Sequence, residues 1–145
     1  MSDKTQLTQH HVYVIELDKE VLKFDDFMLA NPAYKQGMPC FFVGETRHSP
    51  KKRFNYHLVG YKSHEYIRRY ARRLAPEYYT SLNPVNADQA KEVENHLAAK
   101  LRKMGYAVWQ HTDVLNAHRL KKSHSHLRHG HMYYHFVSAK PQIYS

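Results

Sequence analysis

The sequence contains one cysteine, Cys40, and no long apolar run. A single cysteine excludes an internal disulfide framework and favours a reducing compartment. We expect Cys40 to be a buried strand residue with no partner to activate it. No segment approaches the length of about 20 apolar residues that spans a bilayer, and the N-terminus lacks the basic-then-apolar pattern of a secretory signal. These absences predict a cytoplasmic, intracellular protein that makes no membrane contact.

The chain is basic, and its charge is unevenly distributed. Its 145 residues are 42% hydrophobic and 24% charged, which is typical of one globular domain. Residues 1–30 hold 3 basic and 6 acidic side chains, residues 31–110 hold 14 and 6, and residues 111–145 hold 5 and 1, for a net charge of +9. A basic middle and tail favour a nucleic-acid partner, because cations that neutralise phosphates release counterions. The alternative is a basic protein without such a partner.

Periodicity and turn signals predict one α+β domain at residues 11–110, between an N-terminal extension at 1–10 and a basic, His-rich tail at 111–145. A long connection with room for a short helix near residues 25–30 joins the first two strands, which we expect to be antiparallel. The predicted strands are residues 11–17, 40–44 and 106–110, and the second and third of three predicted helices are residues 63–74 and 87–104.

The first predicted helix follows the second strand. The Ser49 hydroxyl can accept a hydrogen bond from an orphan backbone N–H, and Pro50 suits the first helical position. Gly60 ends the helix, because glycine adopts the left-handed conformation at little cost. Phe54 and Leu58 are expected to mark its buried side.

The second predicted helix is amphipathic. Its apolar positions follow the i, i+3, i+4, i+7 pattern, and Arg68, Arg69, Arg72 and Arg73 form the opposite side. These arginines would follow a nucleic-acid backbone, or be no more than a solvated face.

Glu94 is the strongest candidate for a functional residue. Its helical neighbours Ala90, Leu97, Ala98 and Leu101 are all apolar, so its carboxylate faces the core or a cleft. Because an unpaired buried carboxylate is costly, Glu94 requires a metal ion or a basic partner such as an arginine. Glu92, by contrast, has polar neighbours.

Arg53 and His57 project from one face of the first helix, since positions i and i+4 are neighbours. An arginine can bind a phosphate through two hydrogen bonds, and a histidine can hold water or transfer a proton. Tyr13 lies in the strand expected to pair with residues 40–44, whereas Tyr56 is as consistent with packing as with function.

The order Tyr13, Phe42-Val43-Gly44, Arg53, His57 and Glu94 resembles that of the GIY-YIG nuclease superfamily, metal-dependent enzymes that cut phosphodiester bonds. The resemblance covers residues 11 to about 110. It implies a three-stranded antiparallel sheet flanked by three helices, with Tyr13, Arg53, His57 and Glu94 as catalytic residues. It also implies that Glu94 binds a magnesium or manganese ion. The chain departs from the family pattern in two places: Phe42 replaces the second tyrosine, and residues 105–109 lack the usual asparagine.

These observations predict a metal-dependent endonuclease, with DNA favoured over RNA as substrate. One alternative is a nucleic-acid-binding module without catalysis, given Phe42 and the missing asparagine. A second is an enzyme that acts on a small phosphorylated substrate, such as a phosphosugar isomerase. In the tail, alternating histidines could bind metal, or be a weakly basic extension that attracts nucleic acid as the pH falls; they are His118, His124, His126, His129, His131 and His135.

Overall fold

The structure is a computed structural model that describes residues 9–114. Its helices and strands are β1 (Gln9–Leu17), η1 (Lys19–Lys23), α2 (Asp25–Leu29), β2 (Cys40–Thr46), α3 (Pro50–Leu58), α4 (Glu65–Tyr70), β3 (Ala71–Leu74), η2 (Pro76–Tyr78), η3 (Thr80–Leu82), β4 (Val85–Asn86), α5 (Ala90–Lys103) and β5 (Ala107–Trp109). The predicted α+β class is confirmed. None of the described helices is both long enough and apolar enough to cross a membrane. The six tail histidines named above lie outside the described residues.

The strands form one mixed sheet in the order β3-β1-β2-β5, with β4 paired to the start of β1. Strands β1 and β2 are antiparallel, as predicted, and Tyr13 lies opposite Gly44. Strands β3 and β4 are also antiparallel to β1, whereas β5 runs parallel to β2. The sheet is therefore larger than the predicted three-stranded antiparallel sheet, and it is mixed.

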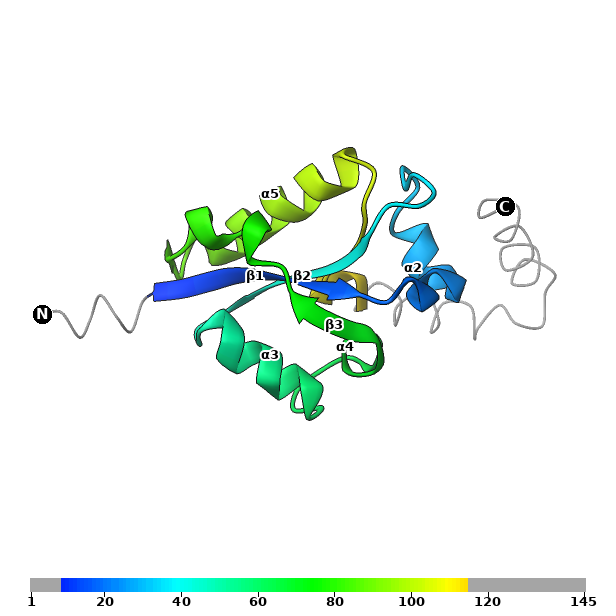
Figure 1. Ribbon diagram of the computed structural model, residues 1–145. Coiled ribbons are helices and arrows are strands. Elements are labelled where there is room, and N and C mark those ends of the chain that lie inside the picture. Colours follow the sequence, from blue (N-terminus) through cyan, green and yellow to red (C-terminus); the bar gives the residue numbers. More distant parts are fainter. Residues whose placement is uncertain (1–8, 115–145) are drawn as a thin grey trace, which may run out of the picture.

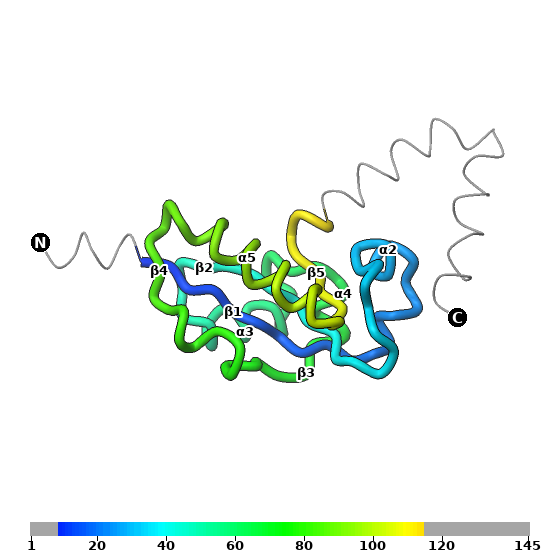
Figure 2. Tube along the Cα trace, turned by 90° about the horizontal axis from the view of Figure 1, so that it is seen from above, coloured from blue at the N-terminus to red at the C-terminus, as the bar shows by residue number. Residues whose placement is uncertain are grey.

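Helices cover both faces of this sheet. In Figure 1, α5 lies on one side of the strands, and α3 and α4 lie on the other. Seen from above, α5 lies over β1 and β2 (Figure 2). The central strands are apolar because both their faces are covered. Val12, Val14 and Ile15 are fully buried, as is Cys40, for which this was predicted.

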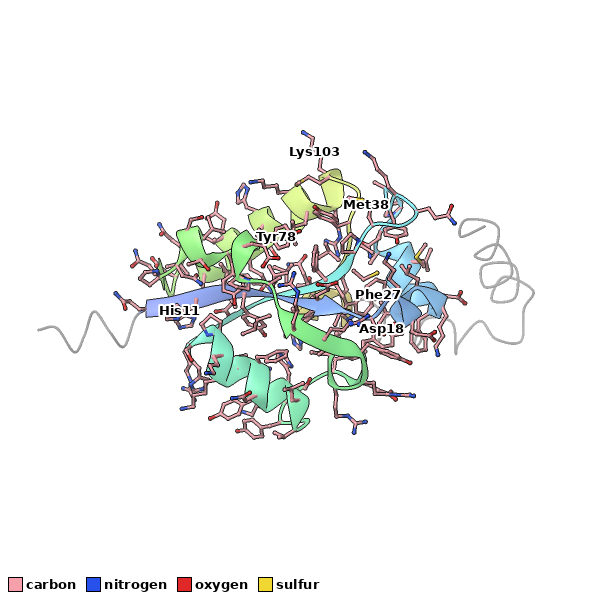
Figure 3. All side chains as sticks on the ribbon, viewed as in Figure 1. His11, Asp18, Phe27, Met38, Tyr78 and Lys103 are labelled. Atoms are coloured by element: carbon pink, nitrogen blue, oxygen red, sulfur yellow. The ribbon has the colours of Figure 1, made fainter. Side chains whose placement is uncertain are left out.

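An aromatic group closes the sheet at the end where α2 lies. The rings of Phe27 and Trp109 stack with their centroids 5.6 Å apart, and Tyr66 packs against both. Figure 3 places Phe27 on α2, whereas Lys103 projects outward from the C-terminal end of α5. This packing holds β5 in place and fixes where the chain leaves it.

The predicted helix at residues 63–74 was wrong in its second half. Helix α4 ends at Tyr70, and residues 71–74 form β3, which pairs with Ile15 and its neighbours on β1. The cause is the open edge of β1, whose backbone groups require partners. An apolar spacing that also fits a helix does not outweigh this pairing.

The predicted strand at residues 106–110 exists as β5, but it lies parallel to its neighbour. It pairs with Cys40–Phe42 of β2. A parallel pair requires a crossover connection, and α5 provides it.

Helix α3 has the predicted ends, and Phe54 packs against the core as predicted, but the rest of its buried side differs. Ser49 Oγ accepts from the backbone N–H of Lys52 at 3.1 Å, and Gly60 has a φ of +82°. Leu58, expected to be buried, is 46% exposed, whereas His57 is 1% exposed. The helix is turned so that His57 faces the sheet, where Tyr13 offers a hydrogen bond.

Candidate active site

One pocket of about 320 Å³ is lined by the four predicted catalytic residues and by Phe42. Tyr13 comes from β1, Phe42 from β2, Arg53 and His57 from α3, and Glu94 from α5. The pocket thus collects side chains from elements on both faces of the sheet.

The pocket lies along the edge of β2 that β5 joins, beside a stretch of that edge that pairs with no described strand. Strand β5 pairs only with Cys40–Phe42, and β2 continues to Thr46. Gly44 and Glu45, in this uncovered stretch, line the pocket. The short length of β5 is therefore what leaves room for a site between α3 and α5.

Gly44 makes space for Tyr13. A Cβ atom at position 44 would lie 2.6 Å from the Tyr13 hydroxyl oxygen and 2.9 Å from the Phe42 ring. No real Cβ approaches other atoms so closely, so the glycine is required for Tyr13 to occupy its position across the strand pair.

Tyr13, His57 and Ser63 form a chain of hydrogen bonds. The Tyr13 hydroxyl lies 2.8 Å from His57 Nε2, and His57 Nδ1 lies 2.8 Å from Ser63 Oγ. The Ser63 hydroxyl donates to the backbone carbonyl of His64 at 3.3 Å, so its oxygen is free to accept from His57 Nδ1–H. His57 Nε2 is then the unprotonated nitrogen, and it accepts from the Tyr13 hydroxyl.

Burial keeps both members of this pair uncharged. Desolvation lowers the pKa of His57 to about 3, with a smaller contribution from the positive charge of Arg53. Desolvation also raises the pKa of Tyr13 above its usual value, and Arg53 acts in the opposite direction there. His57 is therefore a neutral acceptor at physiological pH.

Arg53 is held by the loop that follows α3. Its Nη1 donates to the carbonyl of Tyr61 at 3.2 Å, and its Nη2 donates to that of Lys62 at 2.7 Å. These bonds use two of the five N–H groups of a guanidinium. The guanidinium also interacts with the Tyr13 hydroxyl. Its remaining N–H groups can serve a ligand, and the two carbonyls orient the side chain within the pocket wall.

Glu94 is buried, as predicted, and among the described residues its carboxylate is bound by an amide and a lysine rather than by an arginine. Its Oε2 accepts from Gln110 Nε2 at 2.6 Å and from Lys91 Nζ at 3.2 Å. The carboxylate is 2% exposed, and desolvation raises its pKa above the usual value despite both donors. Glu92, two residues earlier, is exposed. The apolar periodicity of the helix thus correctly distinguished the buried Glu94 from the exposed Glu92.

The carboxylate of Glu94 suits a magnesium or manganese ion. Both hydrogen bonds that it receives from described residues go to Oε2, which leaves Oε1 for another ligand. Residues 9–114 contain no group of three or more His, Cys, Asp or Glu side chains that could hold a metal ion. Magnesium differs from zinc here, because it is commonly held by one or two carboxylates together with water and substrate phosphates.

Phe42 stands at the position that the GIY-YIG pattern gives to its second tyrosine. Its ring centroid is 6.0 Å from that of Tyr13 and 5.5 Å from that of His57. The ring packs the pocket wall but brings no polar atom to it.

The arginines expected on one helix lie on two different elements. Arg68 and Arg69 lie on α4, whereas Arg72 and Arg73 lie on β3. Three of the four pair with carboxylates: Arg69 with Glu65 at 3.2 Å, Arg72 with Asp18 at 3.6 Å, and Arg73 with Glu16 at 2.9 Å and Glu77 at 2.6 Å. No single helix therefore carries all four arginines along a nucleic-acid backbone, as the prediction required.

Sequence reasoning missed Gln110, Ser63 and Lys91. Lys91 stands one helical turn before Glu94, a spacing that could have identified it. Gln110 and Ser63 reach the site only through the path of the chain after α5 and α3, and no local pattern indicates that path.

A larger cavity, of about 550 Å³, lies between α5 and the segment of η2 and η3. Its walls include Val93, Leu97, Leu101 and Met104, and its carboxylate, Glu77, is already paired with Arg73. The smaller pocket brings together the buried carboxylate, the arginine and the histidine, so it is the better candidate for chemistry.

Comparison of the chain with models of protein families, with curated proteins and with solved structures finds no match in any of the three.

Proposed function

We propose that this protein is a metal-dependent endonuclease that hydrolyses phosphodiester bonds in nucleic acid, with DNA as the favoured substrate. The observation that carries the proposal is the shared pocket of Tyr13, Arg53, His57 and Glu94. Their order in the sequence predicted these four residues as a group, although they come from three separate elements, β1, α3 and α5. The resemblance to GIY-YIG nucleases assigns the same residues to catalysis.

Glu94 would hold a magnesium or manganese ion through its carboxylate. Such an ion supplies an activated water and stabilises charge on the leaving oxygen. Gln110 and Lys91 hold the carboxylate in one orientation, so the ligand is already placed before the ion binds.

Arg53 would bind the scissile phosphate. Its guanidinium is held by two backbone carbonyls, so it loses little freedom on binding. It would then stabilise negative charge that gathers on the phosphate oxygens in the transition state.

Tyr13 and His57 would place the attacking water and accept its proton. The water would hydrogen bond to the Tyr13 hydroxyl oxygen, whose own proton points at the unprotonated His57 Nε2. A proton leaving the water could pass to Tyr13 as the Tyr13 proton passes to His57. Burial is the main cause of the lowered pKa of His57, and a bound phosphate would offset the smaller contribution from the Arg53 charge.

The test is incubation of the protein with supercoiled plasmid, branched DNA and structured RNA, in magnesium, manganese or EDTA. We expect cleavage that requires metal, and we expect Glu94→Ala to abolish it. Glu92→Ala is the matched control, because that carboxylate lies on the same helix but is exposed. Cleavage that survives Glu94→Ala would place the metal elsewhere. If the wild type cuts no substrate, the better function is nucleic-acid binding without catalysis, on the same cationic pocket.

A further inference from the structure

A basic segment flanks the pocket and contains no carboxylate of its own. Between Glu45 and Glu65 the sequence has no Asp or Glu. The cations of this segment are Arg47, Lys51, Lys52, Arg53 and Lys62. Among the described residues, none of these cations forms an ion pair with a carboxylate. Their charge is therefore available to a partner, unlike that of the paired arginines on α4 and β3.

The density of this charge affects a neighbouring histidine. The pKa of His48 is lowered, first by desolvation and then by the charges of Lys52, Arg47 and Arg53. A surface that disfavours a further proton in this way favours an anion.

Aromatic rings lie among these cations. Tyr56 and Tyr61 meet edge to face with centroids 5.2 Å apart. Lys52 Nζ lies 5.9 Å from the centroid of Tyr56, and Lys62 Nζ lies 5.4 Å from that of Tyr61. Tyr61 is 52% exposed, and the adjacent Val59 is 78% exposed. A solvated helix end does not require an exposed ring beside a partly buried one, or an exposed aliphatic side chain next to them.

This surface is continuous with the pocket. Lys62 and Arg53 line the pocket, and Arg53 binds the carbonyls of Tyr61 and Lys62. The loop that carries Tyr61 is thus fixed to the residue proposed to hold the scissile phosphate.

We propose that this surface, the α3 face (Arg47, Lys52, Tyr56, Tyr61 and Lys62), binds an unpaired stretch of a nucleic-acid strand and leads it to the pocket; the proposal rests on the function proposed above. The lysines and Arg47 contact phosphates, and Tyr61 stacks on a base. Every base has a stacking face, but the bases of a duplex are covered by their neighbours. An exposed tyrosine among cations therefore selects single-stranded segments, junctions or frayed ends over intact duplex.

The first experiment measures binding alone. Fluorescence anisotropy in EDTA, where cleavage cannot occur, compares a single-stranded oligonucleotide with the same sequence as duplex. We expect tighter binding to the single strand. Arg47→Ala with Lys52→Ala should weaken binding about 10-fold and flatten its dependence on salt, because fewer counterions are released.

Lys100→Ala with Lys103→Ala is the matched control, because it removes two exposed lysines from α5. We expect its affinity to stay within about twofold of wild type. An equal loss in both double variants would mean attraction by net charge alone, and it would overturn the proposal.

The second experiment tests stacking. Tyr61→Ala should weaken single-strand binding about 10-fold, and Tyr61→Phe should restore it, because stacking requires the ring and not the hydroxyl. Quenching of a 2-aminopurine base in the oligonucleotide should disappear in Tyr61→Ala. Preference for duplex, or unchanged quenching, would refute the assignment.

The two proposals can fail separately. Single-strand binding through the α3 face without cleavage under any metal would leave this inference standing and remove the nuclease function. Metal-dependent cleavage together with wild-type affinity in the α3-face variants would support the nuclease function and refute this inference.

Discussion

Gln110 Nε2 donates a 2.6 Å hydrogen bond to the buried carboxylate of Glu94, and Gln110 Oε1 accepts from Arg102 at 3.1 Å. The bond connects the end of β5 to α5, and it supplies an amide donor where residues 105–109 offer no asparagine. A donor to Oε2 favours the charged form of Glu94, which is the form that a metal ion requires.

Replacing Gln110 with Met should weaken metal binding, because it removes this donor while keeping the length of the side chain. The pKa of Glu94, already raised by burial, should rise further. We expect magnesium or manganese affinity to fall by about 10-fold, in the range typical of ligand-orienting residues. Isothermal titration at pH 7 measures it. Asn95→Ala is the control, since Asn95 contacts Gln110 and not the carboxylate. Equal affinities in both variants would show that Gln110 does not support the site.

Gly44→Ala should disrupt the Tyr13–His57 pair. The new Cβ would lie 2.6 Å from the Tyr13 hydroxyl oxygen and 2.7 Å from the ring carbon that carries it, so the ring must move. We expect a loss of about 1–3 kcal/mol in the free energy of unfolding, as is typical for overpacking. Chemical denaturation measures it. In a Tyr13→Ala background the same substitution should cost much less, and an equal cost in both backgrounds would contradict the contact.

Most of the site could be predicted because its signals are local. The apolar neighbours of Glu94 and the four-residue spacing of Arg53 and His57 depend only on helix geometry. Ser49, Pro50 and Gly60 set the ends of α3 through their own backbone chemistry.

The remaining features depend on contacts between distant segments. Residues 71–74 pair with the open edge of β1, and this pairing outweighs their helical spacing. The burial of His57 in place of Leu58 depends on Tyr13, which lies on another element. The parallel direction of β5 depends on the path of α5 across the sheet. No periodicity in the sequence indicates that path.

The free energy of unfolding should decrease as the pH is lowered, because His57 is held neutral in the folded protein. Its pKa is about 3 in the folded protein and about 6.5 in an unfolded chain, so below pH 6.5 the unfolded chain binds a proton that the folded protein does not. The free energy of unfolding should therefore decrease from pH 6.5 downward. This site contributes up to about 1.4 kcal/mol per pH unit.

Comparison with His57→Gln isolates that contribution. The stability advantage of wild type over the variant should shrink by about 2 kcal/mol between pH 7 and pH 5, as denaturant titrations at each pH would measure. An advantage that is constant over this range would mean that His57 titrates normally in the folded protein. The ring NMR signals of His57 should likewise show no transition near pH 6.5.

Phe42→Tyr should raise the cleavage rate, because it adds a hydroxyl to a pocket wall that already holds Tyr13 and His57. Phe42 lines the pocket, with its ring 5.5 Å from that of His57. A second hydroxyl near the attacking water would help to place it and to accept its proton, for which an increase of at least about 10-fold is expected. Single-turnover cleavage in magnesium measures the effect.

Phe41→Tyr is the control for this last substitution. Phe41 is the preceding residue on β2, so its side chain points to the opposite face, where it packs against Tyr78 and Tyr106. Its hydroxyl would be buried away from the pocket, so this variant should lose stability without a gain in rate. A gain in both variants would mean a general effect of the added hydroxyl. A folded Phe42→Tyr protein with the wild-type rate would show that the missing second tyrosine does not limit catalysis.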